Sequence, residues 1–429
     1  MKKLAKLVKE LERDLLICVR CGTCHGVCPL YNITRDEGDV ARGKLSLLDG
    51  LIKNLFSKSD EVNKILNKCL LCGSCAASCP SNVKVTEIFI KARIILAQFS
   101  KLSIFKKIAF RFFIANPKRF DMTARIMEKF QFLFLTTRKN INNTSSLRLI
   151  SPFINSRKFK KIAKIPFHKT KDAKGFSSKK SKFKVAFFPG CVFDKFYPEI
   201  AIDTVKILKH FNVDIFIPQN QGCCGIPSLA SGDKETFTKL VGHNIGLFLK
   251  EDFDCLVTPC ATCLSTIKEW WPIIYKSNDE KQNFFLNNLS IKSHDISQFL
   301  INILKVPDIS NNNAKTITYH DPCHHKKNLK IEAEPRKLII ASGNNLVEME
   351  KSDSCCGMGG TFNLLYYDES IKIGKLKVEN IKKTNCSIVA TSCPACMAQL
   401  TDIAAKQNLD IKINHPIEIY KKTLFNSIE

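Results

Sequence analysis

Eighteen of the twenty cysteines belong to two internal repeats, and these repeats restrict the possible folds more than any other feature. The first repeat holds eight cysteines in two halves displaced by 51 residues, namely Cys18, Cys21, Cys24, Cys28 and then Cys69, Cys72, Cys75, Cys79. The second holds ten cysteines displaced by 132 or 133 residues, namely Cys191, Cys223, Cys224, Cys260, Cys263 and then Cys323, Cys355, Cys356, Cys393, Cys396. Fixed displacements indicate duplicated structural units, so we expect two duplications in one chain.

The two motifs of the first repeat share one spacing: CVRCGTCHGVCP (18–29) and CLLCGSCAASCP (69–80). This is the bacterial ferredoxin pattern for 4Fe–4S clusters, in which the cysteine before proline ligates the other cluster. We therefore predict two cubane clusters, with Cys18, Cys21, Cys24 and Cys79 at cluster 1 and Cys69, Cys72, Cys75 and Cys28 at cluster 2. Zinc is the alternative, but it favours separate Cys-x-x-Cys pairs.

Apolar residues around these motifs recur at helical spacing. Leu4, Leu7, Leu11 and Leu15 precede the first motif, and a helix-sized stretch separates the two motifs, which are displaced by 51 residues. We predict that residues 1–100 form an all-α helical ferredoxin domain.

Each half of the second repeat contains a lone cysteine, then a Cys-Cys-Gly doublet, then a Cys-x-x-Cys pair. Five thiolates exceed what one tetrahedral ion needs, and neighbouring side chains on a strand point to opposite faces. Both thiols of a doublet reach one metal only from a turn, where Gly225 or Gly357 can adopt a positive φ. We predict that all ten cysteines are metal ligands, in one or two non-cubane 4Fe–4S clusters with bridging thiolates.

Zinc, a vicinal disulfide and buried core thiols are the alternatives for these ten cysteines. The identical spacing in two copies disfavours a disulfide or simple core packing. The two remaining cysteines, Cys255 and Cys386, lie outside the repeat and near expected strands, so we predict that they are core thiols.

From residue 183 onward, β-rich runs alternate with helical ones, which predicts α/β units. Strands are expected at KVAFFPG, VDIFIP and CLVTP in the first copy and at TITYHDP, NLVEME and SIVATS in the second. Helices are expected at 233–250 and near 368–383. The predicted fold class is α+β multidomain, with cysteine-rich domains at 183–307 and 308–429 after the helical domain.

Composition places limits on the compartment and on the partners. The sequence is 45% hydrophobic, and it contains neither a run long enough to span a bilayer nor the apolar core of a signal peptide. Twenty cysteines in a cytoplasmic chain suit metal binding better than disulfides. We therefore expect a cytoplasmic protein with no transmembrane segment.

The net charge of +26 is concentrated in one region. Residues 101–184 carry 23 Lys and Arg against three acidic residues, whereas the rest of the chain is nearly balanced. We predict that 101–182 is a basic segment of short helices followed by a linker. It lacks a recognisable nucleic-acid module, and its interleaved aromatic and basic residues suit a peripheral membrane or partner contact. A solvated linker is the alternative.

Taken together, these motifs resemble the iron–sulfur subunits of glycolate oxidase (glycolate dehydrogenase), within the Cys-Cys-Gly cysteine-rich-domain family. Further residues carry the resemblance: DEGDVARGKLSLL (36–48), CPSNVKV (79–85), FFPGC (187–191) and YHDPCH (319–324). Relatives of similar layout are the iron–sulfur subunit of anaerobic glycerol-3-phosphate dehydrogenase and a heterodisulfide reductase subunit. Many glycolate oxidase subunits have a degenerate last Cys-x-x-Cys, whereas CATC and CPAC are intact here.

The resemblance implies an electron-transfer subunit of an acceptor-linked oxidoreductase. A separate FAD-containing flavoprotein would oxidise a 2-hydroxy acid such as glycolate to glyoxylate, and this chain would pass the electrons towards quinone at the inner face of the cytoplasmic membrane. The sequence has no convincing dinucleotide-binding Gly-x-Gly-x-x-Gly, in keeping with a separate flavoprotein, and no catalytic residue is assigned. The alternatives are a subunit whose clusters cleave a disulfide, or a zinc-bearing assembly scaffold.

Overall fold

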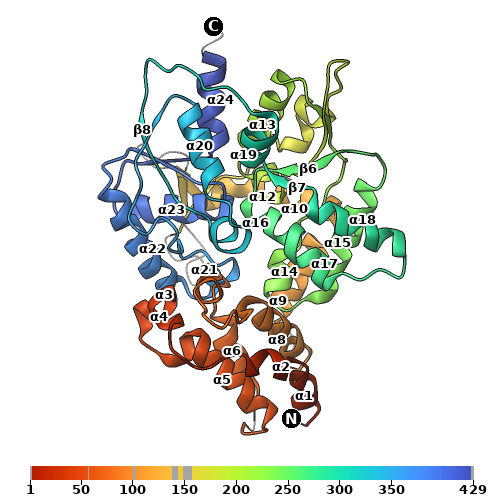
Figure 1. Ribbon diagram of the computed structural model, residues 1–429, viewed down its shortest axis with the longest axis vertical. Coiled ribbons are helices and arrows are strands. Elements are labelled where there is room, and N and C mark those ends of the chain that lie inside the picture. The colour runs from red at the N-terminus through yellow and green to blue at the C-terminus, as the bar shows by residue number, and fades with distance from the viewer. Residues whose placement is uncertain (1, 57, 100–102, 138–143, 148–156, 427–429) are drawn as a thin grey trace.

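The computed structural model describes residues 2–56, 58–99, 103–137, 144–147 and 157–426. It shows a helical N-terminal domain below two α/β units that stand side by side, the first coloured green and the second blue (Figure 1). Among the described residues, none of the helices combines the length and apolarity needed to cross a bilayer.

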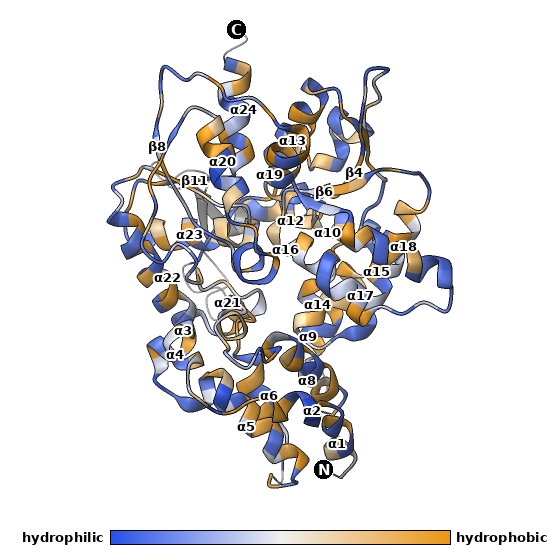
Figure 2. Ribbon diagram, in the orientation of Figure 1, coloured by the Kyte–Doolittle hydropathy of each residue, from blue (hydrophilic) through white to orange (hydrophobic). Residues whose placement is uncertain are grey.

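The N-terminal domain is all-helical, as the sequence predicted. Its longer helices are α1 (Lys2–Val8), α5 (Ala41–Ile52), α6 (Asp60–Asn67) and α8 (Val85–Phe99), and the five-residue α2 (Glu12–Leu16) lies before the first motif. Shorter helices lie at the motifs: α3 (Cys24–Val27), α4 (Pro29–Thr34) and α7 (Ser74–Ala77). Leu4, Val8, Leu48 and Phe89 share one core, and Figure 2 shows hydrophobic stretches along α5 and α8. The helical periodicity thus buries one face of each long helix.

The first α/β unit is a four-stranded parallel sheet with the order β5-β4-β6-β7. Its strands are β4 (Lys184–Phe187), β5 (Asp214–Phe216), β6 (Cys255–Thr258) and β7 (Ser293–Asp295). Its main helices are α12 (Cys191–Lys195), α13 (Pro198–His210), α14 (Ile226–Ala230), α15 (Lys234–Phe248), α16 (Ala261–Ser265), α17 (Trp271–Ile274), α18 (Glu280–Ile291) and α19 (Ile296–Gln298).

The second unit repeats this topology, with the sheet order β11-β10-β8-β9. Its strands are β8 (Thr316–Tyr319), β9 (Asn345–Leu346), β10 (Ile388–Ala390) and β11 (Lys412–Asn414). Its helices include η8 (His324–Leu329), α20 (Ala333–Ala341), α21 (Thr361–Leu365), α22 (Tyr367–Lys382), α23 (Pro394–Lys406) and α24 (Pro416–Asn426). In each unit the first strand pairs with the second and third, which confirms the duplication predicted from cysteine spacing.

This strand order decides where a site forms. The chain leaves the first strand towards one side of the sheet and later crosses to the other side, so a crevice opens beyond the carboxyl ends of the first and third strands. Cys191 and Cys260 follow β4 and β6 at this point, and Cys323 and Cys393 follow β8 and β10. The fold therefore brings distant cysteines to one edge of each sheet.

The six strands predicted from sequence are present, and β7 and β11 were not predicted. These two edge strands read SHD and KIN, which lack the apolar run that identified the others. The helices predicted at 233–250 and near 368–383 correspond to α15 and α22.

The basic segment is more structured than a linker. Its helical part contains α9 (Ile104–Lys107), the π-helix η3 (Ile108–Ile114) and the 18-residue α10 (Pro117–Phe134), so not all of its helices are short. Three strands form an antiparallel sheet: β1 (Leu135–Thr137), β2 (Thr144–Leu147) and β3 (Lys158–Lys160). The N–H of Lys158 donates to Asp402 of the second unit, and Phe167 is buried in the first. The parts of the basic segment at 138–143 and 148–156 lie outside the described residues.

Arg93 joins the helical domain to the first unit. This side chain on α8 is buried and donates hydrogen bonds to three backbone carbonyls, those of Leu66, Cys69 and Ala230, at 2.6–2.7 Å. The helix lies so close to the loop after α14 that a Cβ at Gly232 would come within 2.5 Å of the Arg93 carbonyl oxygen. The guanidinium therefore fixes the docking of the two domains.

Replacing Arg93 with Met is expected to destabilise the protein, because each buried carbonyl left without a donor costs about 1–3 kcal/mol. We expect the thermal midpoint of the metal-loaded protein, followed by circular dichroism, to fall by several degrees. Lys91→Met on the same helix is the control, since Lys91 is partly exposed and pairs with Glu87 and Asp14 at the surface. Equal midpoints for the two variants would contradict a structural role for Arg93.

Candidate metal centres

The cysteines of the first repeat line two adjoining cavities in the helical domain. One cavity is bordered by Cys28, Cys69, Cys72 and Cys75, the set predicted for cluster 2. The other is bordered by the set predicted for cluster 1, Cys18, Cys21, Cys24 and Cys79, and also by Cys75. The fourth cysteine of each motif therefore lies with the first three of the other motif.

Local backbone geometry prepares these cavities for sulfur-bound iron. Gly22 and Gly73 have positive φ values of 85° and 74°, so the chain turns tightly beside the thiols. The N–H of Leu71 donates to Cys69 Sγ at 3.4 Å, and the N–H of Tyr31 donates to Cys28 Sγ at 3.5 Å. Such hydrogen bonds stabilise negative charge on sulfur and tune the potential of a cluster.

Two buried cations, which sequence analysis did not identify, lie next to the cluster 2 cavity. Burial raises the pKa of the Cys69 thiol, and the charges of Lys44 and Arg93 act in the opposite direction. Lys44 is fully buried and donates to the Gly38 carbonyl at 2.8 Å. Lys44 lies within the DEGDVARGKLSLL stretch, so its lysine was visible in sequence but its burial was not.

Each unit of the second repeat gathers its five thiols into one connected group, and the order of contacts is the same in both. In the first unit Cys191 contacts Cys223, with 3.6 Å between sulfurs, and the contacts continue through Cys224, Cys263 and Cys260. In the second unit the succession is Cys323, Cys355, Cys356, Cys396 and Cys393, with 3.3 Å between the sulfurs of Cys356 and Cys396.

The glycine after each doublet forms the turn that the sequence predicted. Gly225 and Gly357 have φ values of 95° and 93°. The N–H of each glycine donates to the first sulfur of its doublet, Cys223 at 3.5 Å and Cys355 at 3.4 Å. The turn thus directs both thiols of a doublet into the group and gives one of them an amide donor.

The donor set and its surroundings fit an iron–sulfur group. A Cβ at Gly190 would lie only 2.8 Å from Cys263 Sγ, so the loop before Cys191 needs glycine to approach the other thiols. All ten cysteines of the two groups are free thiols; Cys191 and Cys323 are partly exposed, and the others are buried. Contiguous soft sulfur donors shielded from water are what iron–sulfur groups require.

The cysteines of the cluster 2 cavity and the thiols of the second unit are in contact. Cys72 and Cys355 pack in the same cluster, and the interaction with the Cys355 thiol, followed by burial, holds the pKa of the Cys72 thiol well above its usual value. Leu70 packs in the same apolar cluster as Cys355. A Cβ at Gly73 would come within 2.8 Å of Asn328 Oδ1, so the two domains approach closely here.

The two units also meet at their thiol groups. Thr262, between the last two cysteines of the first unit, has its hydroxyl oxygen 3.3 Å from Cys393 Sγ and 3.2 Å from His324 Nδ1 of the second. The N–H of Ala261 donates to the Ser392 carbonyl at 3.0 Å. One hydroxyl group thus separates the two five-thiol groups.

A polar pocket adjoins the first unit's thiols and was not predicted from sequence. Cys191 and Cys223 line it together with Asp121, His168, Asp194 and Lys195. Burial disfavours the Asp194 carboxylate, but the hydrogen bond from His168 and the charge of Lys195 outweigh it and hold its pKa below the usual value. One clue was available, because Asp121 is one of three acidic residues in an otherwise basic segment.

The two cysteines outside the repeats lie elsewhere. Cys255 is buried in β6 within an apolar cluster, and Cys386 is buried with its thiol 3.5 Å from the Thr384 carbonyl oxygen. Neither cysteine belongs to a five-thiol group, in line with the prediction that both are core thiols.

Comparison with known proteins supports this arrangement of domains. A family model described as "4Fe-4S dicluster domain" matches residues 14–83, and one described as "Cysteine-rich domain" matches residues 185–268 and again 317–401. The chain is 29% identical to the "Probable glycolate oxidase iron-sulfur subunit" of Bacillus subtilis, over 96% of this chain and 95% of that protein.

Two further relatives match about half of the chain. One is a subunit of the fumarate reductase (CoM/CoB) of Methanothermobacter marburgensis, 32% identical over 55% of this chain and 45% of that protein. The other, "Lactate utilization protein A" of an Exiguobacterium strain, is 29% identical over 55% of this chain and 96% of that protein. The chain is therefore an iron–sulfur protein that joins a 4Fe–4S dicluster domain to a tandem pair of domains of the cysteine-rich (CCG) family, related to glycolate oxidase iron–sulfur subunits.

Proposed function

We propose that this protein is the electron-transfer subunit of a flavin-linked 2-hydroxy-acid dehydrogenase, with glycolate as the substrate and glyoxylate as the product of its flavoprotein partner. The observation that carries the proposal is the unbroken succession of four sulfur-rich sites. It runs from cluster 1 through cluster 2 and the second unit to the first unit, with direct contacts at Cys72–Cys355 and at Thr262–Cys393.

Both ends of this succession are accessible. At one end, the Cys21 side chain is exposed beside cluster 1. At the other end, Cys191 is partly exposed and borders the pocket of Asp121, His168 and Lys195. A chain of sites with two accessible ends suits a protein that receives electrons from one partner and delivers them to another.

The residues of the chain have three tasks in this function. Eighteen cysteines would hold the metal, the ten of the cysteine-rich domains in non-cubane 4Fe–4S groups. Backbone amides and the buried cations Lys44 and Arg93 stabilise negative charge near the sulfurs. Packing buries most of the thiols of the cysteine-rich domains. When bound, iron–sulfur groups accept and release single electrons.

The electrons and protons of the proposed reaction balance when a flavoprotein is the partner. Oxidation of glycolate to glyoxylate releases two electrons and two protons to the flavin. The two protons would go to solvent, the two electrons would enter this chain one at a time, and reduction of a quinone would consume two electrons and two protons. The name of the Bacillus subtilis relative, an iron–sulfur subunit, supports a separate catalytic partner.

The test is to isolate the native complex, identify the flavoprotein and compare Cys355→Ser/Cys356→Ser with wild type. We expect about sixteen irons in wild type and about twelve in the variant. Glycolate should still bleach the flavin of the variant complex, whereas reduction of a quinone analogue should fall at least about a hundredfold because one site in the path is lost. Cys255→Ser/Cys386→Ser is the matched control, with two buried thiols removed and both activities retained.

Other outcomes would favour a different metal, substrate or function. About eight irons with bound zinc would contradict iron–sulfur clusters in the cysteine-rich domains. Bleaching by lactate or glycerol-3-phosphate in place of glycolate would change the substrate. A preparation without flavin that reduces a mixed disulfide would favour a disulfide reductase.

We also propose that α10 brings the protein to the inner face of the cytoplasmic membrane. Met122, Ile126 and Phe130 lie four residues apart on this helix, and each is more than half exposed. Exposed cations flank them, namely Lys118, Arg119, Arg125 and Lys129. A helix with an apolar stripe and basic flanks suits binding to an anionic lipid surface.

Replacing Ile126 and Phe130 with Ser is expected to weaken binding to anionic phospholipid vesicles about tenfold in flotation at low salt, because two apolar side chains no longer enter the lipid. The control is Phe284→Ser/Ile291→Ser on α18, which removes two side chains of 72% and 71% exposure from another helix. Equal flotation of the two variants would contradict docking through α10.

A further inference from the structure

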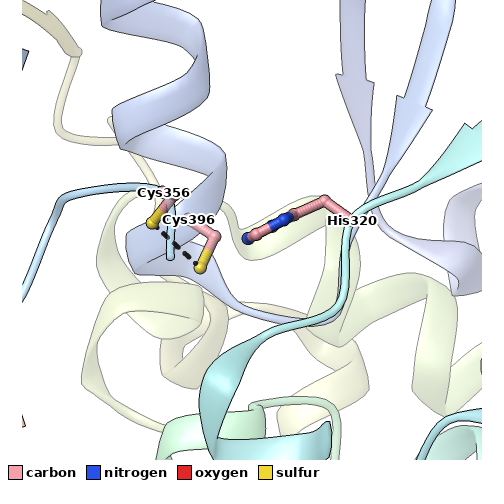
Figure 3. A group of neighbouring side chains, drawn as sticks. All are labelled: His320, Cys356 and Cys396. Atoms are coloured by element: carbon pink, nitrogen blue, oxygen red, sulfur yellow. Dashed lines mark hydrogen bonds between the residues drawn. The ribbon is translucent and has the colours of Figure 1, made fainter. Parts of the chain in front are cut away.

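His320 lies against the thiols of the second unit without a partner of its own. It follows β8 directly and comes three residues before Cys323, and only 1% of it is exposed. A ring nitrogen of His320 and the sulfurs of Cys356 and Cys396 all lie within 4.8 Å of one another (Figure 3). Neither ring nitrogen makes a hydrogen bond among the described residues.

A buried imidazole without a partner is costly, since it has lost the hydrogen bonds that water gave it and has gained none from the protein. The first unit shows that packing does not require an imidazole here. Phe188 holds the equivalent position, three residues before Cys191, and it is fully buried against Phe248 and Trp271. The two units thus differ at this position, where an apolar ring in the first unit is replaced by a nitrogen donor in the second.

We propose that His320 is a nitrogen ligand of the metal group in the second cysteine-rich domain. This domain then has a mixed sulfur and nitrogen donor set, whereas the first domain has sulfur donors only. The inference rests on the proposed function insofar as the five thiols of the second unit must hold a metal group.

The geometry favours coordination over a hydrogen bond. The imidazole makes no hydrogen bond to the sulfur of Cys356 or of Cys396. The two sulfurs themselves are 3.3 Å apart. Metal–nitrogen bonds of about 2.1 Å and metal–thiolate bonds of about 2.3 Å place two donors of one ion up to about 4.4 Å apart. An ion among these three atoms is therefore within reach of all of them after small side-chain rotations.

Backbone hydrogen bonds fix the segment that carries His320. The N–H of the next residue, Asp321, donates to the Ser352 carbonyl at 3.1 Å. The His320 backbone is held in turn, because its N–H donates to the Ala390 carbonyl at 2.9 Å.

Coordination by His320 has a chemical consequence. A neutral imidazole adds a ligand without adding negative charge, and histidine ligation raises the reduction potential of iron–sulfur centres relative to all-thiolate ligation. The metal group of the second unit should therefore be easier to reduce than that of the first. It lies between cluster 2 and the first unit, so it would hold an electron in the middle of the path.

The test uses the full-length, metal-loaded protein labelled with ¹⁵N-histidine and examined by pulsed EPR. We expect a strong nitrogen hyperfine coupling from a directly bound histidine in wild type and its loss in His320→Phe, which gives the second unit the residue of the first. Phe188→Leu is the matched control at the equivalent position and should keep the coupling. Redox titration should show the second-unit signal shifted to lower potential in His320→Phe only.

Two results would overturn the inference. One is a metal group in the second unit of wild type without strong histidine nitrogen coupling. The other is the same coupling and the same potential in His320→Phe. The first result is measured on the wild-type protein alone, so it tests the inference even if the His320→Phe variant fails to load metal. If wild type instead holds no metal at the second unit, the proposed cluster itself fails, and iron analysis distinguishes that case.

Discussion

The contact of sulfur with sulfur inside the protein is the constraint on which the rest of the structure depends. Ten thiols meet in two groups, with separations as short as 3.3 Å, and most of them are shielded from water. Thiolates brought this close repel one another unless cations neutralise them, and buried thiols lose their protons only when a metal takes their place. Folding of these domains and loading of metal are therefore coupled.

This constraint explains features that look unrelated in the sequence. Glycine follows each doublet because a positive φ is needed to direct two adjacent side chains the same way. Glycine precedes Cys191 because a side chain there would strike Cys263. The parallel sheets matter for the same reason, since their strand order opens one edge at which the loops of three strands converge.

Cysteine spacing allowed the fold class, the duplication and the grouping of the thiols to be predicted, because ligand spacing directly reflects backbone geometry around a metal. Six of the eight strands of the two parallel sheets followed from β-rich runs. The edge strands SHD and KIN did not, because pairing with a neighbouring strand, and not an apolar composition, makes them strands. The contact of Cys72 with Cys355 joins residues 283 positions apart, and nothing local encodes it. His320 lies in YHDPCH, one of the motifs that carry the family resemblance. Only the structure shows that its ring nitrogens lack hydrogen-bond partners among the described residues.

The thiol groups also have a spatial order that differs from their order in the sequence. The cysteines of the cluster 2 cavity contact the second unit, and the second unit contacts the first, so the third of these domains in sequence joins the two that precede it. Residues 1–307 therefore contain the two outer sites but not the unit that connects them. Any segment that ends before residue 308 lacks both Cys355 and Cys393, through which the two outer sites are joined.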